Sequence, residues 1–298
     1  MPSASLIEAL KRRILLCDGA MGTQLQLAGL RPGQCGEAWN LEKPSEILQI
    51  QQRYAQAGAD CLITNTFGAN ARVLKKHGLD GRVAEINQAA VRIARQAAGA
   101  EAYVLGDIGP LGEMLEPLGD ITEEQAAALF DEQAAALIEA GADAIIIETM
   151  MALDELLCAV GAVRARSASI PVIASMAYDR LPAGGYATLM GISPEQQAQQ
   201  CAAAGADIIA CNCGTSLAVA DHAALITAFG RACDRPLMTQ PNAGKPEVQG
   251  ERVIYRETPE KMAEDIPALI AAGARIIGGC CGTTPAHIAA FRERLRAA

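Results

Sequence analysis

The chain has 298 residues and a net charge of −9 at pH 7, and 51% of its residues are hydrophobic against 20% charged. This acidic balance excludes a general nucleic-acid binder, because neutralising phosphates requires clustered Lys and Arg. The apolar content excludes a disordered segment, since it is sufficient to build a buried core. No apolar run approaches the ~20 residues of a membrane helix, and the first residues lack the order of a signal peptide. We therefore expect a cytoplasmic protein whose partners include neither nucleic acid nor a membrane.

One pattern occurs four times along the chain. Each copy is an Ala-Gly-Ala segment, closed by Asp60, Asp143, Asp207 or Arg275, that leads into a short apolar run. An Ala-rich helix end, a Gly suited to the position after the helix and a β-branched run are typical of a helix followed by a strand. Four further apolar runs lack this lead-in. Together the four runs with the lead-in and the four without it give eight predicted strands. They start near residues 14, 60, 102, 143, 170, 206, 236 and 275.

Eight apolar strands, separated by segments long enough for a crossover helix, predict a parallel barrel. A doubly wound open sheet is the alternative, but residues 18–23 read Asp-Gly-Ala-Met-Gly-Thr where that fold would carry Gly-x-Gly-x-x-Gly. No Pro- or Ser-rich linker divides the chain. We predict an α/β protein with a (β/α)8 TIM-barrel fold that forms a single domain over residues 1–298.

Chemistry in such barrels is located at the carboxyl ends of the strands, where the loops to the following helices meet. Polar residues and thiols stand at these ends, directly after runs that are otherwise apolar. They are Asp18, Thr64, Asn65, Thr66, Asp107, Glu148, Thr149, Met176, Asn212, Cys213, Pro241, Asn242, Cys280 and Cys281.

Three of these residues form a candidate metal site. Cys213 ends the sixth predicted strand, and Cys280 and Cys281 end the eighth, so their thiols face one mouth. Zn²⁺ favours soft sulfur ligands in tetrahedral geometry, and three protein ligands leave the fourth position for a substrate. Glycines flank the adjacent pair and permit the backbone that neighbouring ligands need. The alternative is a buried or disulfide-linked pair, which a reducing compartment disfavours.

The chain has ten cysteines, and most are expected to be buried thiols. Cys211 and Cys213 share one face of a strand under strict alternation, whereas Asn212 points away, so either thiol could reach the metal. Cys213 lies nearer the carboxyl end and is preferred. Cys211 is expected to fill the barrel.

Histidine is informative because none of the three, His77, His222 and His287, stands at a strand end. His287 follows a Thr-Pro start typical of the last helix. Without an imidazole at the mouth, neither a Cys–His nucleophile nor a Ser–His–Asp triad is supported. A metal would instead have to activate the nucleophile by holding a substrate thiol as a thiolate near neutral pH.

Asp18 and Glu148 are candidate substrate-binding residues. Two carboxylates at the mouth could hold the ammonium group of an amino acid, while backbone amides from Gly19 onward face its carboxylate. The alternative is that each side chain caps the helix that follows it, which is worth ~1 kcal/mol.

Seven segments taken together resemble the homocysteine S-methyltransferase family, over nearly the whole chain from Ile14 to Arg292. The Asn-Cys pair with the downstream Gly-Gly-Cys-Cys-Gly-Thr is the specific part of the match. The segments are DGAMGT (18–23), ITNTFGAN (63–70), GDIGP (106–110), IIIETM (145–150), CNCG (211–214), QPNAG (240–244) and GGCCGTTPAHI (278–288).

The resemblance implies a (β/α)8 barrel in which Zn²⁺ is held by Cys213, Cys280 and Cys281. It also implies that Asp18 and Glu148 bind the amino group of homocysteine. Asn242 matches a residue that approaches zinc when homocysteine is absent. The implied reaction transfers a methyl group to the thiol of homocysteine and gives methionine.

Within the family, the chain is similar to the homocysteine-binding modules of cobalamin-dependent methionine synthases. The methyl donor is then expected to be methylcobalamin on a separate corrinoid protein, because no folate, cobalamin or reactivation module follows the barrel. Alternatives are an S-methylmethionine- or betaine-dependent enzyme and a methyltransferase with another thiol acceptor. The remaining alternatives are a non-enzymatic regulator that binds zinc or homocysteine and an oxidoreductase that uses the vicinal cysteines.

Overall fold

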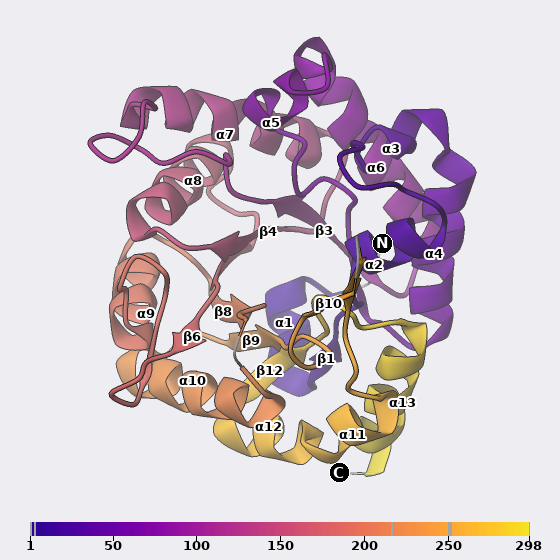
Figure 1. Ribbon diagram of the computed structural model, residues 1–298, viewed down its shortest axis with the longest axis vertical. Coiled ribbons are helices and arrows are strands. Elements are labelled where there is room, and N and C mark those ends of the chain that lie inside the picture. Colours follow the sequence, from indigo (N-terminus) through magenta and orange to yellow (C-terminus); the bar gives the residue numbers. More distant parts are fainter. Residues whose placement is uncertain (1, 3, 216, 250–251, 298) are drawn as a thin grey trace.

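The computed structural model describes residues 2, 4–215, 217–249 and 252–297. In these residues, eight parallel strands form a barrel surrounded by helices, with the strand order β1-β12-β9-β8-β5-β4-β3-β2 (Figure 1). A parallel bridge between Cys17 and Cys61 joins the first and last of these strands and closes the barrel. The strands are β1 (Leu15–Leu16), β2 (Cys61–Ile63), β3 (Tyr103–Ile108), β4 (Ala144–Met150), β5 (Val172–Met176), β8 (Ile208–Asn212), β9 (Leu237–Gln240) and β12 (Ala274–Ile277).

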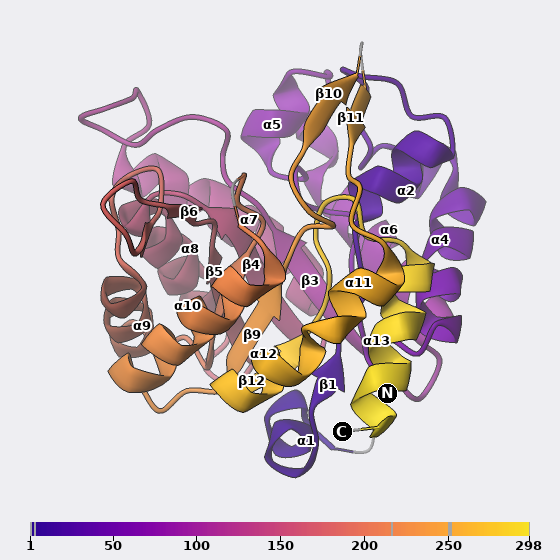
Figure 2. The same ribbon diagram turned by 60° about the horizontal axis from the view of Figure 1, so that its bottom comes forward.

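The predicted barrel and the order of its strands are confirmed. Two short antiparallel hairpins, which the sequence pattern did not predict, extend the carboxyl end of the barrel. One consists of β6 (Asp179–Arg180) and β7 (Tyr186–Ala187) and follows β5. The other consists of β10 (Glu247–Gln249) and β11 (Arg252–Ile254), follows β9, and projects from the top of the molecule in Figure 2.

Helices connect the strands and cover the outside of the barrel (Figure 1). Ser or Thr begins several of them; Thr122 and Ser193 each form a capping box with the Gln three residues later. None of the helices in the described residues is long and apolar enough to cross a membrane. The helices are α1 (Leu6–Arg12), α2 (Met21–Leu27), α3 (Trp39–Glu42), α4 (Pro44–Gln56), α5 (Ala71–Lys75), η1 (Asp80–Arg82), α6 (Val83–Ala98), α7 (Glu123–Glu139), α8 (Leu153–Arg166), α9 (Pro194–Ala203), α10 (Val219–Ala232), α11 (Pro259–Glu264), α12 (Ile266–Ala272) and α13 (Pro285–Ala297).

The strands separate two apolar clusters. The larger cluster lies between the outer face of the strands and the helices, and the smaller one fills the barrel. Leu6, Ala9 and Leu10 of α1 belong to the smaller cluster, so this helix closes the amino-terminal end of the barrel. In Figure 2 it lies below β1, at the end opposite the β10–β11 hairpin. The closed end leaves the carboxyl end of the barrel as the accessible mouth.

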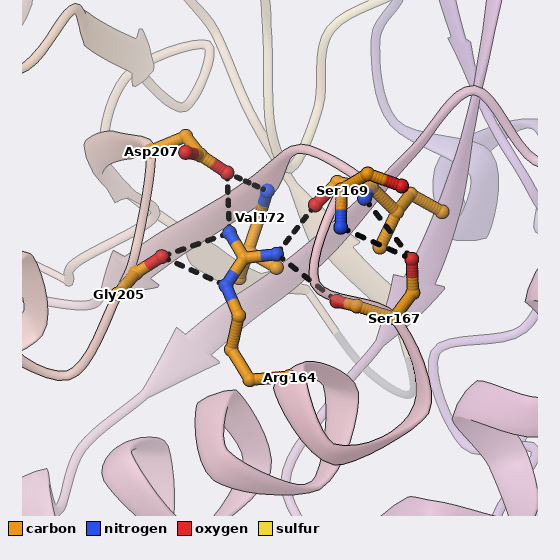
Figure 3. A network of polar contacts seen from close by, with 7 residues as sticks. Arg164, Ser167, Ser169, Val172, Gly205 and Asp207 are labelled. Carbon is orange, nitrogen blue, oxygen red and sulfur yellow. Dashed lines mark hydrogen bonds and ion pairs between the residues drawn. The ribbon is translucent and has the colours of Figure 1, made fainter.

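The repeated Ala-Gly-Ala-Asp segments form ion-paired clamps around the barrel wall. In Figure 3, the carboxylate of Asp207 accepts a hydrogen bond from the backbone N–H of Val172, 2.9 Å away, and pairs with Arg164. The Arg164 guanidinium also donates to the carbonyl of Gly205, with its Nε at 2.9 Å. The Asp that precedes β8 is therefore bonded to the start of the neighbouring strand β5 and to a helix α8 side chain.

Two further copies repeat this arrangement: Asp60 with Leu16, Gly58 and Arg292, and Asp143 with Val104, Gly141 and Arg95. The fourth copy carries Arg275 in place of the Asp, and its guanidinium donates instead to the backbone carbonyl of Leu10 at the end of α1, with Nε at 3.0 Å. The clamp residues thus bond each of these strand starts to an adjacent element.

We expect Asp207→Ala to lower the free energy of unfolding by about 2–3 kcal/mol, because it leaves the Val172 amide without its acceptor and the Arg164 guanidinium without its ion-pair partner. Urea denaturation would measure the loss. The matched control is Asp131→Ala, which removes the more exposed Arg166–Asp131 pair and should cost much less. Equal losses in the two variants would contradict a stabilising role for the clamp.

Candidate metal centre and substrate pocket

The inward-facing series of the strands becomes polar at the mouth. Leu105, Ile146, Ile173, Ala210 and Met238 belong to the cluster inside the barrel. Because side chains alternate along a strand, the residues two positions further on also face inward. These residues are Asp107, Glu148, Ser175, Asn212 and Gln240.

The sulfur atoms of Cys213, Cys280 and Cys281 lie within 4.8 Å of one another at this mouth. The two adjacent thiols are 4.0 Å apart. In a tetrahedral zinc site with Zn–S bonds near 2.3 Å, the sulfurs stand about 3.8 Å apart, so small adjustments would bring all three onto one ion. Hydrogen bonds from the other two thiols lower the pKa of Cys281 to about 3, which places negative charge on the cluster.

An unusual backbone directs Cys213 into the mouth. Its φ is +60°, a conformation that is uncommon for residues other than glycine. The turn interrupts the strand alternation, so the three residues at this strand end do not follow the predicted pattern. Asn212 faces the barrel interior, and Cys211 packs in the outer cluster, where its sulfur lies 3.4 Å from Thr239 Oγ1 and 3.6 Å from His222 Nδ1. The prediction that Cys211 fills the barrel was wrong.

Asp18 and Glu148 lie at the mouth, and neither caps a helix. The residues at the N-caps of the following helices are Ala20 and Ala152, without side-chain caps. Asp18 is 2% exposed and accepts a hydrogen bond from the Ile63 amide at 2.9 Å. The capping alternative is therefore wrong for both carboxyl groups.

Burial raises the pKa of Asp18 to about 8, and the charge of Glu148 adds to the effect. Burial also raises the pKa of Glu148 to about 7, with a further contribution from Cys213 and an opposing hydrogen bond from Gln240. Glu148 Oε2 has no hydrogen-bond partner among the described residues. The mouth thus holds carboxyl groups that a cationic ligand would favour in the charged form.

Asp107 is a third buried carboxyl group at this mouth. Its pKa is raised by burial and by the charges of Glu148, Glu37 and Asp18, and its Oδ1 has no partner among the described residues. Asp107 is among the strand-end residues of the sequence analysis, where no feature distinguishes it from the others. Its inward position in β3 is the signal that the sequence contained.

Gly19 lies where a side chain would not fit. A Cβ atom there would stand 2.6 Å from Thr283 Oγ1 and 3.0 Å from the Tyr54 ring. The next amide, that of Ala20, already donates to Thr283 Oγ1 at 3.1 Å. Of the amides proposed to face a substrate carboxylate, the one on Ala20 is therefore engaged within the protein.

Asn242 lies beside the thiol cluster. Its Nδ2 donates to the Gly214 carbonyl at 2.7 Å and to Cys213 Sγ at 3.6 Å. Its Oδ1 is buried and has no partner among the described residues. The amide oxygen is therefore available to a ligand.

Neither His222 nor His287 belongs to the thiol cluster, although His222 bonds to the backbone of Cys213. His222 is 1% exposed, and burial lowers its pKa to about 4, so it packs as a neutral side chain against Thr239. His287 lies in α13 and bonds to Thr284 and to the Glu257 carbonyl. The expectation that His287 belongs to the last helix is confirmed.

We expect the purified chain to retain one equivalent of zinc, and Cys280→Ser to lose it while the barrel remains folded, because a hydroxyl is a poor substitute for a thiolate ligand. Metal analysis after dialysis against a mild chelator would measure retention, and circular dichroism would monitor the fold. Cys211→Ser is the matched control, since this thiol lies outside the cluster beside polar partners. Full retention by Cys280→Ser would contradict the assignment.

Comparisons with known proteins agree with this geometry. Residues 15–295 match the family model described as homocysteine S-methyltransferase. The chain is 34% identical to a methionine synthase of Mycobacterium tuberculosis and 33% identical to one of Mycobacterium leprae, over 95% of its own length. It spans about a quarter of the length of these relatives.

Among solved structures, the metallated form of the homocysteine methyltransferase MmuM from Escherichia coli superposes with a TM-score of 0.79 at 25% identity, covering 97% of this chain and 99% of that one. The carboxyl transferase domain of Rhizobium etli pyruvate carboxylase, at 17% identity and a TM-score of 0.56 over 97% of this chain and 48% of that one, shares the fold. The family match covers nearly the entire barrel and includes every cysteine of the cluster. The chain therefore belongs to the homocysteine S-methyltransferase family.

Proposed function

We propose that the chain is a zinc-dependent homocysteine S-methyltransferase that transfers a methyl group to the thiol of homocysteine and releases methionine. The observation that carries the proposal is the juxtaposition of a soft three-thiol cluster with buried carboxyl groups that cap no helix. Thiol ligands suit the metal, and the carboxyl groups suit the ammonium of an amino acid. An amino acid with a thiol side chain supplies both the sulfur for the metal and the ammonium for the carboxyl groups.

Cys213, Cys280 and Cys281 would hold the zinc ion and leave one position for the substrate sulfur. When bound, zinc lowers the pKa of a ligating thiol and so supplies a thiolate at neutral pH. Asn242 would approach the same position in the absence of homocysteine, with its unpartnered Oδ1 as the ligand atom. The three glycines around the cysteine pair stand where no side chain would fit; a Cβ on Gly282 would stand 2.3 Å from the Tyr255 side chain.

Asp18 and Glu148 would bind the ammonium group. The free oxygen of Glu148 and the buried carboxyl of Asp18 offer acceptors on opposite sides of the mouth, at the ends of β4 and β1. An ammonium group placed there would favour the ionised form of both carboxyls and so offset the cost of their burial. Gly19 would face the substrate carboxylate through its backbone amide.

The methyl donor we propose is methylcobalamin, presented by a corrinoid protein that docks on the mouth. The large apolar side chains that are exposed in the described residues all lie in segments that follow the carboxyl end of a strand: Leu27, Phe67, Met114, Leu118, Met151, Leu181, Leu189, Val248 and Val253. Apolar side chains exposed in segments on one end of the barrel would suit the docking of a partner protein there.

All ten cysteines are free, which supports a location in the cytoplasm.

Asp18→Asn and Glu148→Gln are each expected to raise KM for homocysteine about ten- to hundredfold, the equivalent of the ~1.5–3 kcal/mol of a hydrogen bond to a charged group. Zinc content should stay unchanged. Steady-state kinetics with saturating donor would measure KM. Glu155→Gln is the matched control, since this buried carboxyl accepts the Leu111 amide at 2.8 Å away from the cluster. An unaltered KM in both mouth variants would refute the binding role.

Methionine formation from homocysteine is expected with methylcobalamin as donor, and mass spectrometry would detect it. Parallel reactions would contain S-methylmethionine, betaine, or a different thiol in place of homocysteine. Turnover with S-methylmethionine alone would contradict the corrinoid proposal and favour the S-methylmethionine-dependent alternative. Preferential methylation of another thiol would contradict the assigned acceptor.

A further inference from the structure

Two strained turns stand side by side at the mouth. Among the described residues, the non-glycine residues with positive φ are Thr149 and Cys213, both at +60°. Thr149 follows the candidate substrate ligand Glu148, and Cys213 is itself a candidate metal ligand. This conformation is unfavourable for a β-branched residue such as Thr149, so it persists only where neighbouring groups hold it.

The side chain of Asn212, the residue before Cys213, bonds to the Thr149 turn and to Cys280 of the thiol cluster. Its Oδ1 accepts hydrogen bonds from the Thr149 backbone N–H at 3.0 Å and from Ser175 Oγ at 2.6 Å. Its Nδ2 donates to Thr149 Oγ1 at 2.7 Å and to Cys280 Sγ at 3.7 Å. Both lone pairs and both protons of the amide are thereby used. The residue is 1% exposed, so water does not compete for these bonds.

The network requires an amide. Two groups, the Thr149 N–H and Ser175 Oγ, need an acceptor, and two, Thr149 Oγ1 and Cys280 Sγ, need a donor; only Asn or Gln offers two lone pairs and two protons from one planar group. A carboxylate at this position would keep the acceptor contacts but place a negative charge against the sulfur. An alanine would remove all four side-chain bonds and leave the Thr149 turn and Cys280 without this support.

We propose that Asn212 is a positioning residue that couples the metal site to the substrate site. Through its bond to Cys280 it fixes the thiol cluster, and through Thr149 it fixes the segment that carries Glu148. Partners of this kind orient metal ligands and typically change metal affinity 10- to 100-fold when removed. The coupling to homocysteine rests on the proposed function, whereas the coupling to the metal does not.

The metal arm of the test measures zinc affinity by competition with a chromophoric chelator, and the Co²⁺–thiolate absorption of the cobalt-loaded protein. We expect Asn212→Asp and Asn212→Ala to weaken zinc binding about 10- to 100-fold and to shift the cobalt spectrum. The matched control is Asn87→Asp. Asn87 is fully buried and donates to the Ala69 and Val83 carbonyls, both at 2.8 Å, far from the thiols, so its zinc affinity should be that of the wild type.

The substrate arm measures KM for homocysteine with zinc at saturation. Asn212→Ala should raise KM severalfold because it releases the Thr149 turn, whereas Asn212→Asp, which keeps the acceptor for the Thr149 amide, should change KM less. A split of this kind between two variants at one position is not expected from a general loss of stability. Folded Asn212 variants with wild-type zinc affinity and KM would overturn the proposal.

If the Asn212 variants do not fold, Thr149→Ala keeps the test decisive. It removes one of the four bonds, and we expect smaller changes in zinc affinity and KM in the same directions; wild-type values for both would overturn the proposal. Failure of the wild-type protein to methylate homocysteine would refute the proposed function instead. The zinc affinities and cobalt spectra would then still decide the role of Asn212.

Discussion

The pleat of a parallel strand lets only every second side chain enter the barrel, and the arrangement of the mouth follows from this constraint. Below the mouth the inward positions are apolar and fill the interior with α1. One step higher, the same series places Asp107, Glu148, Asn212 and Gln240 around a common centre. The thiols come from the turns just beyond the strands, where the alternation no longer holds. The polar side chains of the strands thus lie directly below the candidate metal ligands, which the loops provide.

Charge is handled differently at the two ends of the barrel. At the amino-terminal end, Asp60, Asp143 and Asp207 are each matched by a guanidinium and a backbone amide. At the mouth, Asp107 and Glu148 each keep an oxygen without a partner in the described residues, and burial raises the pKa of both. The arrangement at the amino-terminal end stabilises the folded protein without any ligand. The second leaves an unmet requirement for positive charge, which a substrate ammonium would satisfy.

The barrel was predictable because its strands are continuous apolar runs and its repeated Ala-Gly-Ala segments mark the helix ends. The three clustered cysteines followed from the rule that carboxyl ends of strands converge. The orientations at residues 211–213 were not predictable, because alternation assumes extended backbone and Cys213 adopts a positive φ without being glycine. The same turn hid the role of Asn212, which sequence reasoning directed away from the mouth. The Gly after Cys213, whose own φ is +92°, was the one local signal of an irregular strand end.

The exchange of Asp for Arg275 in the fourth Ala-Gly-Ala copy breaks the internal symmetry of the barrel at one place. Three copies direct a carboxylate toward the wall, whereas this copy directs a cation toward the carbonyl at the end of α1. That helix belongs to no repeat unit and approaches the barrel from below. If all four Ala-Gly-Ala copies carried the same residue, none of them would be distinguished as the attachment site of α1. The reversed charge thereby adds an attachment for α1 at the amino-terminal end of the barrel, beside its buried apolar face, and the carboxyl end is left open to substrates.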